Sequence, residues 1–175
     1  MKTVKNIISM AAICALMFSM VGCFGSDKFA QEVEKEKGAV KLVREIQRGG
    51  YDVITTQELK GLQDKGEEMV IIDTMPYEAS YKKEHVPGAK QFLFPIPDMV
   101  EWDVKETDGK TKEQFIEMLG PDKDKLIVIY CGFVKCTRSH NGAAWAKKLG
   151  YTNVKRYPGG IFAWKGAKNQ VGSVK

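Results

Sequence analysis

From Tyr51 onward, short runs of β-branched and other apolar residues alternate with segments of helical periodicity. Strands that alternate with helices in this way are typical of an α/β domain built on a mostly parallel sheet. The segments with strand character are 52–54, 69–73, 91–93, 126–130 and 154–157. We therefore expect one three-layer domain over residues 51–175, with a central, mostly parallel sheet flanked by helices.

Two of these strands are apolar throughout, at residues 69–72 and 126–129. A strand that is apolar on both faces is usually buried on both faces, which requires helices on each side of the sheet. The pattern therefore predicts that these two strands lie at the centre of the sheet.

Helix starts are marked by two capping boxes, in which a threonine is followed three residues later by Glu or Gln. Thr55 with Glu58 is the first, and Thr111 with Gln114 is the second. Glycines mark the ends of the later helices. The expected helices are 56–64, 112–119 and 140–149.

The N-terminus has the layout of a secretory signal, residues 1–22, with Lys2 and Lys5 before an apolar run. The run is shorter than the ~20 residues that span a bilayer, which disfavours a permanent transmembrane helix. Met20-Val21-Gly22-Cys23 resembles a bacterial lipobox, and this resemblance implies that Cys23 is lipidated. We expect an extracytoplasmic protein, anchored to the membrane through Cys23 on the periplasmic side or at the cell surface. An ordinary cleaved signal with a chance cysteine is the alternative.

Residues 23–50 read as a polar tether followed by a charged helix that ends at Gly49-Gly50. Its apolar residues recur at loosely helical spacing, so we expect it to pack on the domain through that side. The residues concerned are Val33, Val40, Val43 and Ile46.

Charge and ligand chemistry exclude some classes of partner. Lys+Arg 27 against Asp+Glu 22 gives a net charge of +5, but the charges are scattered, so no nucleic-acid partner is expected. The two histidines and the cysteines match no common zinc pattern, and we expect neither a metal nor a cofactor.

Cys131 directly follows the central strand 126–130, and a helix follows its loop. In open parallel sheets, ligands bind beyond the carboxyl ends of the strands. Backbone N–H groups and the helix dipole there favour a thiolate, and Lys135 and Arg138 add positive charge. The pattern predicts an anionic nucleophile that handles an anionic substrate. The alternative is that Cys131 is a small buried residue that ends a strand.

Three blocks, in order, resemble the rhodanese (sulfurtransferase) family. They are Asp73 with Tyr81 and His85-Val86-Pro87-Gly88-Ala89, then Cys131 with its loop, then Pro158-Gly159-Gly160 with Trp164. The resemblance extends from Tyr51 to Ala167. It implies a single rhodanese-like domain carried on a lipoprotein.

The resemblance also implies a persulfide mechanism. Cys131 would be the catalytic residue, accepting sulfane sulfur from thiosulfate, polysulfide or a persulfide. It would pass that sulfur to a thiophilic acceptor, either a small anion or a protein thiol. The loop that would bind the substrate and hold the persulfide comprises Gly132, Phe133, Val134, Lys135, Cys136, Thr137, Arg138 and Ser139.

The sequence departs from the family pattern at two positions. The common family loop has Cys, four residues and Arg, whereas Cys136 stands at that spacing here and the arginine follows at Arg138. Related phosphatases and arsenate reductases have five residues in between, so the spacing fits neither class. Met75 stands where many members carry an arginine, which predicts that Asp73 has no ion pair.

Cys136 lies five residues after Cys131 in the same loop. It is a candidate resolving thiol, which would form a disulfide with an oxidised or persulfidated Cys131. Equally, it could simply pack. Two alternative functions stay open: a thiol-disulfide redox protein that uses both cysteines, and a non-catalytic sulfur carrier or sensor. A phosphatase or arsenate reductase is a more distant alternative.

Two histidines and one apolar segment complete the candidate site. We expect His85 to be a structural, hydrogen-bonded residue, and His140 to occupy a surface position on the helix after the loop. The segment 95–102 would either shape a substrate pocket or cover the sheet.

Overall fold

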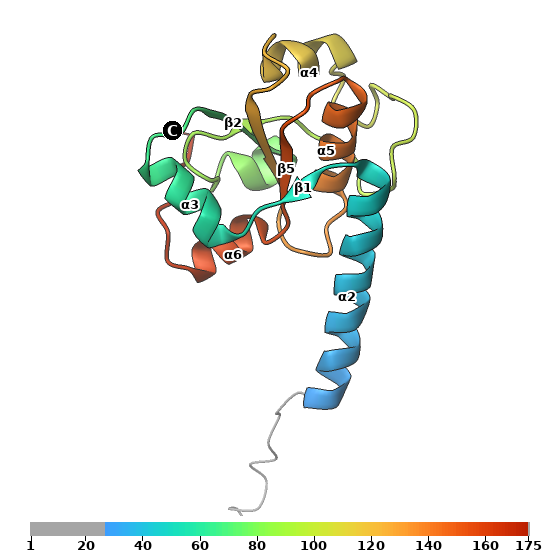
Figure 1. Ribbon diagram of the computed structural model, residues 1–175, viewed down its shortest axis with the longest axis vertical. Coiled ribbons are helices and arrows are strands. Elements are labelled where there is room, and N and C mark those ends of the chain that lie inside the picture. The colour runs from blue at the N-terminus through green and yellow to red at the C-terminus, as the bar shows by residue number, and fades with distance from the viewer. Residues whose placement is uncertain (1–26, 175) are drawn as a thin grey trace, which may run out of the picture. The chain divides into compact units, whose positions relative to one another are not determined.

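The computed structural model describes residues 27–174, so the signal segment 1–22 and Cys23 lie outside the described residues. The chain divides into two units, residues 1–36 and residues 37–175, and the second contains the whole sheet. Among the described residues, no helix is both long and apolar enough to cross a membrane. Figure 1 shows the elements, which in chain order are α2 (Lys28–Gly49), β1 (Asp52–Val53), α3 (Thr56–Asp64), β2 (Met69–Asp73), the π-helix η1 (Tyr77–Tyr81), β3 (Lys90–Gln91), α4 (Lys112–Leu119), β4 (Leu126–Tyr130), α5 (Arg138–Lys148), β5 (Val154–Tyr157) and α6 (Gly160–Gly166).

The five strands form one parallel sheet in the order β1-β5-β4-β2-β3. The predicted parallel α/β sheet is therefore confirmed, with β4 at its centre and β2 beside it. In the register, Asp73 pairs with Tyr130 and Tyr130 pairs with Tyr157. The carboxyl ends of three neighbouring strands thus meet directly before Cys131.

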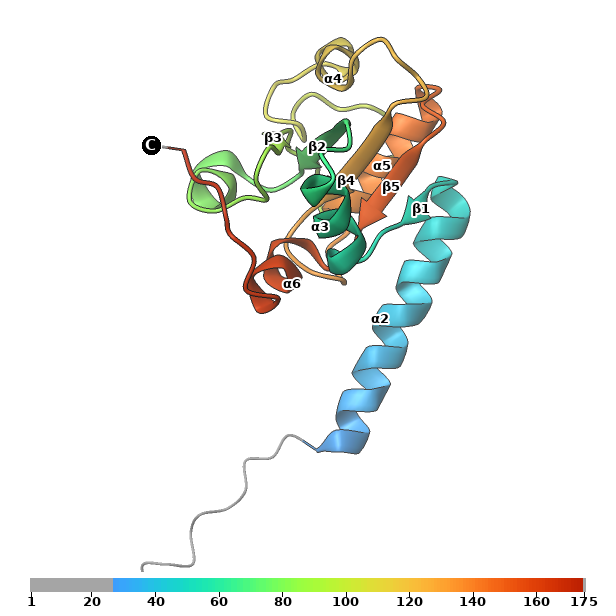
Figure 2. The ribbon, with the colours of Figure 1, turned by 60° about the vertical axis from the view of Figure 1, so that its left-hand side comes forward.

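Helices cover both faces of the sheet, as the wholly apolar strands predict. On one face, Ile127 and Ile129 of β4 pack in a cluster with residues of α4 and α5. On the other face, Val128 and Tyr130 pack with residues of α3 and α6. Figure 2 shows α5 and α6 on either side of β4. Burial of these apolar side chains is the main stabilising term of the domain.

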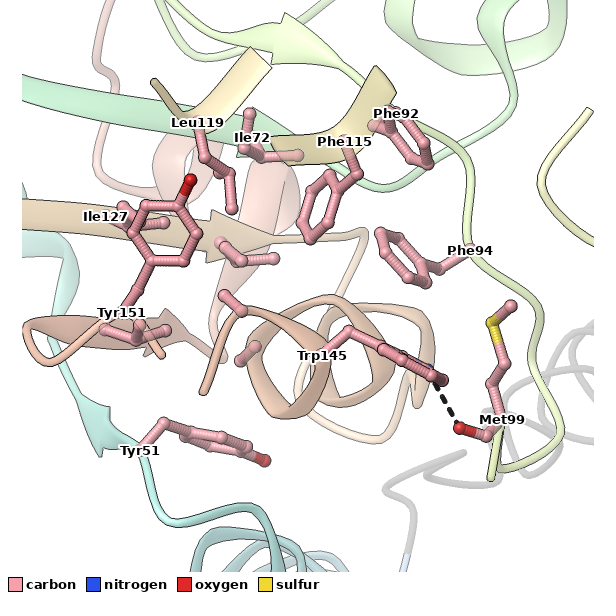
Figure 3. Packing of buried hydrophobic residues seen from close by; sticks show 14 residues of the cluster. Tyr51, Ile72, Phe92, Phe94, Met99, Phe115, Leu119, Ile127, Trp145 and Tyr151 are labelled. Atoms are coloured by element: carbon pink, nitrogen blue, oxygen red, sulfur yellow. Dashed lines mark hydrogen bonds between the residues drawn. The ribbon is translucent and has the colours of Figure 1, made fainter. Parts of the chain in front are cut away.

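An aromatic cluster fills the first of these faces, and Figure 3 shows it at close range. Phe92 and Phe94 follow β3, and their rings lie 4.8 and 5.1 Å from that of Phe115 on α4. Trp145 of α5 donates a hydrogen bond from its indole N–H to the carbonyl oxygen of Met99, at 2.9 Å. The segment 95–102 therefore covers the sheet and α5, which is the second of its two expected roles.

Both predicted capping boxes are present, at Thr55 and Thr111. The helix after the loop begins at Arg138, two residues before its predicted start, because Thr137 already has helical backbone angles. The sequence pattern did not predict η1 or α6. Both are short, and their residues carry no clear apolar periodicity.

The start of α6 requires a glycine. Gly160 has a φ of +58°, and a Cβ at this position would lie 2.2 Å from the carbonyl oxygen of Cys131. The close approach lets the N–H of Ile161 bond to that oxygen, and the N–H of Phe162 bond to the carbonyl of Gly132, each at 3.0 Å. The closing Gly-Gly motif thus fixes the backbone at the start of the loop after β4.

Within residues 37–49, the predicted packing of the N-terminal helix is confirmed for Ile46, which lies against the core, and is wrong for the two valines. Val40 and Val43 are exposed, whereas the buried residues of α2 are Gly38, Glu45 and Gly49. A charged glutamate can be buried here because its partner, Arg156, is supplied by a distant strand. The spacing of apolar residues along α2 could not predict this burial, because it does not show that Arg156 of β5 lies against Glu45.

Candidate active site

Cys131 lies directly after β4 and is fully buried. Its thiol can donate to the carbonyl oxygen of Cys136, at 3.4 Å, and its sulfur lies 3.1 Å from Oγ of Ser139. A second carbonyl oxygen, of Phe133, lies at 3.9 Å. Two acceptors next to this sulfur favour its protonated form.

Ser139 lies between Cys131 and a buried arginine. Arg156 on β5 is fully buried, and its Nε donates a hydrogen bond to Oγ of Ser139 at 2.9 Å. Since this Oγ accepts from the guanidinium, its own O–H is free to donate to the sulfur of Cys131. Ser139 therefore favours a thiolate at Cys131, and the positive charge of Arg156 reinforces the donated bond.

The predicted lowering of the Cys131 pKa is not what the site produces. Burial raises the pKa of the Cys131 thiol well above its ordinary value, the neighbouring Cys136 raises it further, and Ser139 only partly opposes these effects. The helix dipole and the loop N–H groups were the basis of the prediction. Their effect is outweighed because the sulfur is removed from water.

Cys136 holds the thiolate instead. A hydrogen bond from the Cys131 thiol, assisted by the N–H groups of Arg138 and Gly132 and by the charge of Arg138, lowers the pKa of Cys136 to about 6. Cys136 is also the more accessible cysteine, since it is only partly buried. Two backbone N–H groups of the loop, which were expected to stabilise an anion at Cys131, thus act on the sulfur of Cys136.

The other residues of the loop make two kinds of contact: some side chains are exposed to solvent, and some backbone carbonyl groups bond to the buried Arg156. Phe133 and Val134 are exposed, and the ring of Phe133 lies 5.6 Å from that of Phe162 on α6. The carbonyl oxygens of Val134 and Cys136 accept hydrogen bonds from the second terminal nitrogen of Arg156, at 3.4 and 2.8 Å. Arg156 therefore determines the path of the loop as well as the position of Ser139.

Arg138 and Lys135 were predicted to attract anionic substrates. The guanidinium of Arg138 donates to the carbonyl oxygen of Phe94, and its charge acts on Cys136. The carbonyl oxygen of Lys135 accepts a hydrogen bond from Nζ of Lys41. Arg138 thus contributes positive charge next to the cysteine pair while its side chain also ties the loop to the segment after β3.

The C-terminal half of α2 holds the loop from the other side, a contribution that the sequence reasoning missed. Glu45 accepts a hydrogen bond from Arg156 at 2.5 Å, and both side chains are buried. Lys41 donates to the carbonyl of Lys135 at 2.8 Å and to the hydroxyl of Thr137 at 2.5 Å. The sequence holds only a weak signal for this network, since β5 carries two neighbouring positive charges, Lys155 and Arg156, and nothing local shows that Arg156 is the buried one.

His140 is buried, so the prediction of a surface position is wrong. Its Nδ1 lies 2.7 Å from the hydroxyl of Tyr51, and its Nε2 accepts a hydrogen bond from Arg48 at 3.1 Å. Burial lowers the pKa of His140 to about 4, which leaves the ring neutral at physiological pH. His140, with both ring nitrogens engaged by Tyr51 and Arg48, therefore supports the contact between α2 and α5.

Asp73, at the end of β2, is fully buried next to the loop. Its Oδ1 accepts a hydrogen bond from the N–H of Met75 at 2.9 Å, whereas no group within residues 27–174 lies in hydrogen-bonding geometry to its buried Oδ2. Burial raises the pKa of Asp73 to about 6, against the opposing effects of Met75 and Tyr130.

His85 has the predicted structural role. Its ring stacks on that of Tyr81 at 4.2 Å, and its Nδ1 lies 2.8 Å from the carbonyl oxygen of Tyr81. Within residues 27–174, no group of three or more His, Cys, Asp or Glu side chains could hold a metal ion.

A parallel sheet with β4 at its centre, a cysteine at the end of that strand, and an N–H-rich loop leading into α5 define a rhodanese-type domain. The rhodanese-like domain family matches residues 55–167. This match covers more than half of the chain, and the protein therefore belongs to the rhodanese-like domain family. Family membership supports a role related to sulfur transfer.

Solved structures show the same fold. A thiosulfate sulfurtransferase from Pseudomonas aeruginosa is 21% identical with a TM-score of 0.57, and the match covers 79% of this chain and 23% of that one. The polysulfide-sulfur transferase of Wolinella succinogenes is 10% identical with a TM-score of 0.52, covering 79% and 89%. BH2092 from Bacillus halodurans is 24% identical with a TM-score of 0.50, covering 77% and 86%. None of the curated proteins matches this chain.

Proposed function

We propose that this protein is an extracytoplasmic, lipid-anchored sulfurtransferase that carries sulfane sulfur as a persulfide on Cys131. The observation that supports this most strongly is the contact of 3.1 Å between the Cys131 sulfur and Ser139, whose hydroxyl is in turn bonded to Arg156. Such a chain supplies hydrogen bonding and positive charge to a sulfur anion that is otherwise shielded from water.

Sulfur uptake begins with deprotonation of Cys131. Cys136 has the lowered pKa of the two and its backbone contacts the Cys131 sulfur, so it is the group placed to receive the proton as Cys131 attacks the donor. With thiosulfate, a bond forms between the Cys131 sulfur and the sulfane sulfur, the S–S bond of the donor breaks, and sulfite leaves with the electron pair. With polysulfide, the leaving group is the polysulfide shortened by one sulfur.

The persulfide then passes its outer sulfur to a thiophilic acceptor. Of the exposed side chains beside the loop, three are apolar, namely Phe133, Val134 and Phe162, and one, Lys135, is charged. An apolar rim of this kind suits the surface around a protein thiol better than it suits a small hydrated anion. A thiol protein is therefore the favoured physiological acceptor, and small sulfur-containing anions are the favoured donors.

The proposed location rests on Cys23 and the segment before it, which lie outside the described residues. Two or more acyl chains on Cys23 would give stable attachment, whereas one chain gives only marginal binding. In a bacterial host, Cys23→Ser should move the protein from the membrane fraction to the soluble or secreted fraction. Unchanged membrane attachment of this variant would contradict the lipid anchor.

Turnover with thiosulfate or polysulfide as donor and cyanide as acceptor tests the activity, with thiocyanate as the product measured. Wild type should form thiocyanate catalytically, and Cys131→Ser should form none above the uncatalysed rate. Equal turnover by the two proteins would reject Cys131 as the carrier. A single equivalent of thiocyanate without turnover would instead support the sulfur-carrier alternative.

A further inference from the structure

The loop returns Cys136 to the sulfur of Cys131. A hydrogen bond of 3.0 Å from the N–H of Cys136 to the carbonyl oxygen of Phe133 closes a tight turn. This turn brings the carbonyl of Cys136 to 3.4 Å from the Cys131 sulfur, so the two cysteine residues are in contact within one loop. Both cysteines are free thiols. Two free thiols held on contacting residues of one loop are placed for reaction with each other.

We propose that the cysteine pair gives the protein a second activity, the reduction of sulfane sulfur to hydrogen sulfide, in which Cys136 attacks the Cys131 persulfide and forms an internal disulfide. This inference rests on the proposed function, because it begins from the persulfide on Cys131. It adds a product, hydrogen sulfide, and a co-substrate class, a dithiol reductant.

The step balances in atoms and electrons. The sulfur of Cys136 attacks the inner sulfur of the Cys131 persulfide, a Cys131–Cys136 bond forms, and the bond to the outer sulfur breaks. The outer sulfur leaves with the electron pair, takes up the proton of the Cys136 thiol and departs as hydrogen sulfide. In this step the outer sulfur is reduced by one electron and the sulfur of Cys136 is oxidised by one. Counted from sulfane sulfur and two free thiols, the sulfur gains two electrons and each cysteine sulfur loses one.

The surroundings of Cys136 favour both attack and departure. The N–H groups of Gly132 and Arg138, with the charge of Arg138, stabilise an anionic sulfur at this position. The same donors are positioned to stabilise the hydrosulfide as it leaves. Cys136 is also partly exposed, which gives the product a route to solvent. By contrast, Cys131 is shielded from water, so external thiols reach its persulfide less readily.

The disulfide must be reduced before the next cycle. A dithiol protein does this by thiol–disulfide exchange: one of its thiolates attacks the exposed sulfur of Cys136, and its second thiol then releases Cys136 and leaves the partner oxidised. The apolar rim of Phe133, Val134 and Phe162 is the surface next to that sulfur. The partner class is therefore a dithiol protein, and the net reaction is sulfane sulfur plus dithiol giving hydrogen sulfide plus disulfide.

The test is one cycle without external thiol. Reduced wild type, Cys136→Ser and Cys131→Ser are exposed to polysulfide until their intact masses stop changing, the donor is removed, and mass and released sulfide are followed. Wild type should lose two hydrogens and release one equivalent of sulfide per chain. Cys136→Ser should instead gain one sulfur atom, retain it, and release sulfide only when dithiothreitol is added.

Three results would overturn the inference. Wild type that keeps its added sulfur as long as Cys136→Ser does would show that Cys136 does not resolve the persulfide. Failure of Cys136→Ser alone to take up sulfur, even at a pH high enough to ionise Cys131 without Cys136 as proton acceptor, would make Cys136 the first acceptor rather than the resolving thiol. In both cases the sulfur-transfer function would stand, whereas failure of all three proteins to take up sulfur would reject that function together with the inference.

Discussion

The hydroxyl of Ser139 lies 3.1 Å from the sulfur of Cys131, on the side facing Arg156. Because this hydroxyl is the side-chain donor that opposes the effect of burial, Ser139→Ala should raise the pKa of Cys131 further. We expect sulfur uptake by Cys131 near neutral pH to slow by about tenfold, the equivalent of about 1.4 kcal/mol. The rate of persulfide formation, followed by intact mass as a function of pH, measures this.

Thr152→Ala is the matched control for Ser139→Ala, since its hydroxyl is exposed and bonds to Asp124 away from the loop. The control should load sulfur at the wild-type rate. An unchanged pH profile in Ser139→Ala would show that the hydroxyl has no influence on the reactivity of Cys131.

Alkylation should distinguish the two cysteines. With its pKa lowered to about 6, Cys136 is a thiolate at pH 7, whereas Cys131 is a buried thiol. Iodoacetamide should therefore modify Cys136 first, with a rate that rises through pH 6 and levels off above pH 7. Peptide mass spectrometry at short times identifies the modified residue. Prior modification of Cys131 would contradict this assignment of the thiolate.

Asp73 should make stability depend on pH. Its folded pKa, about 6, lies above its ordinary value of 3.8, so the folded state holds a proton that the unfolded state has lost between these values. The resulting contribution to the free energy of unfolding is complete below pH 4 and is lost as pH rises through 6. At about 1.4 kcal/mol for each pKa unit, the loss is about 3 kcal/mol.

Asp73→Asn tests this, because the amide keeps the acceptor for the N–H of Met75 but does not titrate. Urea unfolding at pH 4 and pH 7 gives the difference in unfolding free energy between the variant and wild type. That difference should shift by about 3 kcal/mol in favour of the variant as pH rises. A difference that is the same at both pH values would mean that Asp73 titrates normally.

The buried pair Glu45–Arg156 should show strong coupling. Glu45→Gln leaves the Arg156 cation without its partner in a buried position, which costs about 3–5 kcal/mol of unfolding free energy. Arg156→Gln should cost a similar amount. The double variant should be destabilised by clearly less than the sum of the two, as measured by urea unfolding. Additive effects would show that the two charges do not stabilise each other.

Local signals predicted much of this fold. The apolar strands β2 and β4 have their predicted bounds, and the capping boxes at Thr55 and Thr111 open helices where expected. Each of these signals is contained in a few neighbouring residues. The position of Cys131 at the end of the central strand follows from the same information, and so does its place in the family.

What sequence could not predict depends on contacts between distant segments. Arg156 is buried only because Glu45 and Ser139 come to it from α2 and α5. The pKa of Cys131 is raised where a lowered value was expected, because burial of its sulfur outweighs the helix dipole, and the lowered pKa belongs to Cys136. Burial and partner geometry are properties of the folded chain, and no local pattern encodes them.

The most direct test of the account uses Cys136→Ser, in which the persulfide should persist. After exposure to thiosulfate or polysulfide, its intact mass should increase by one sulfur atom, fragmentation should locate that atom on Cys131, and cyanide should remove it as thiocyanate. The Cys131→Ser, Cys136→Ser double variant should gain nothing. A mass that does not change, or added sulfur on any residue other than Cys131, would contradict the persulfide mechanism.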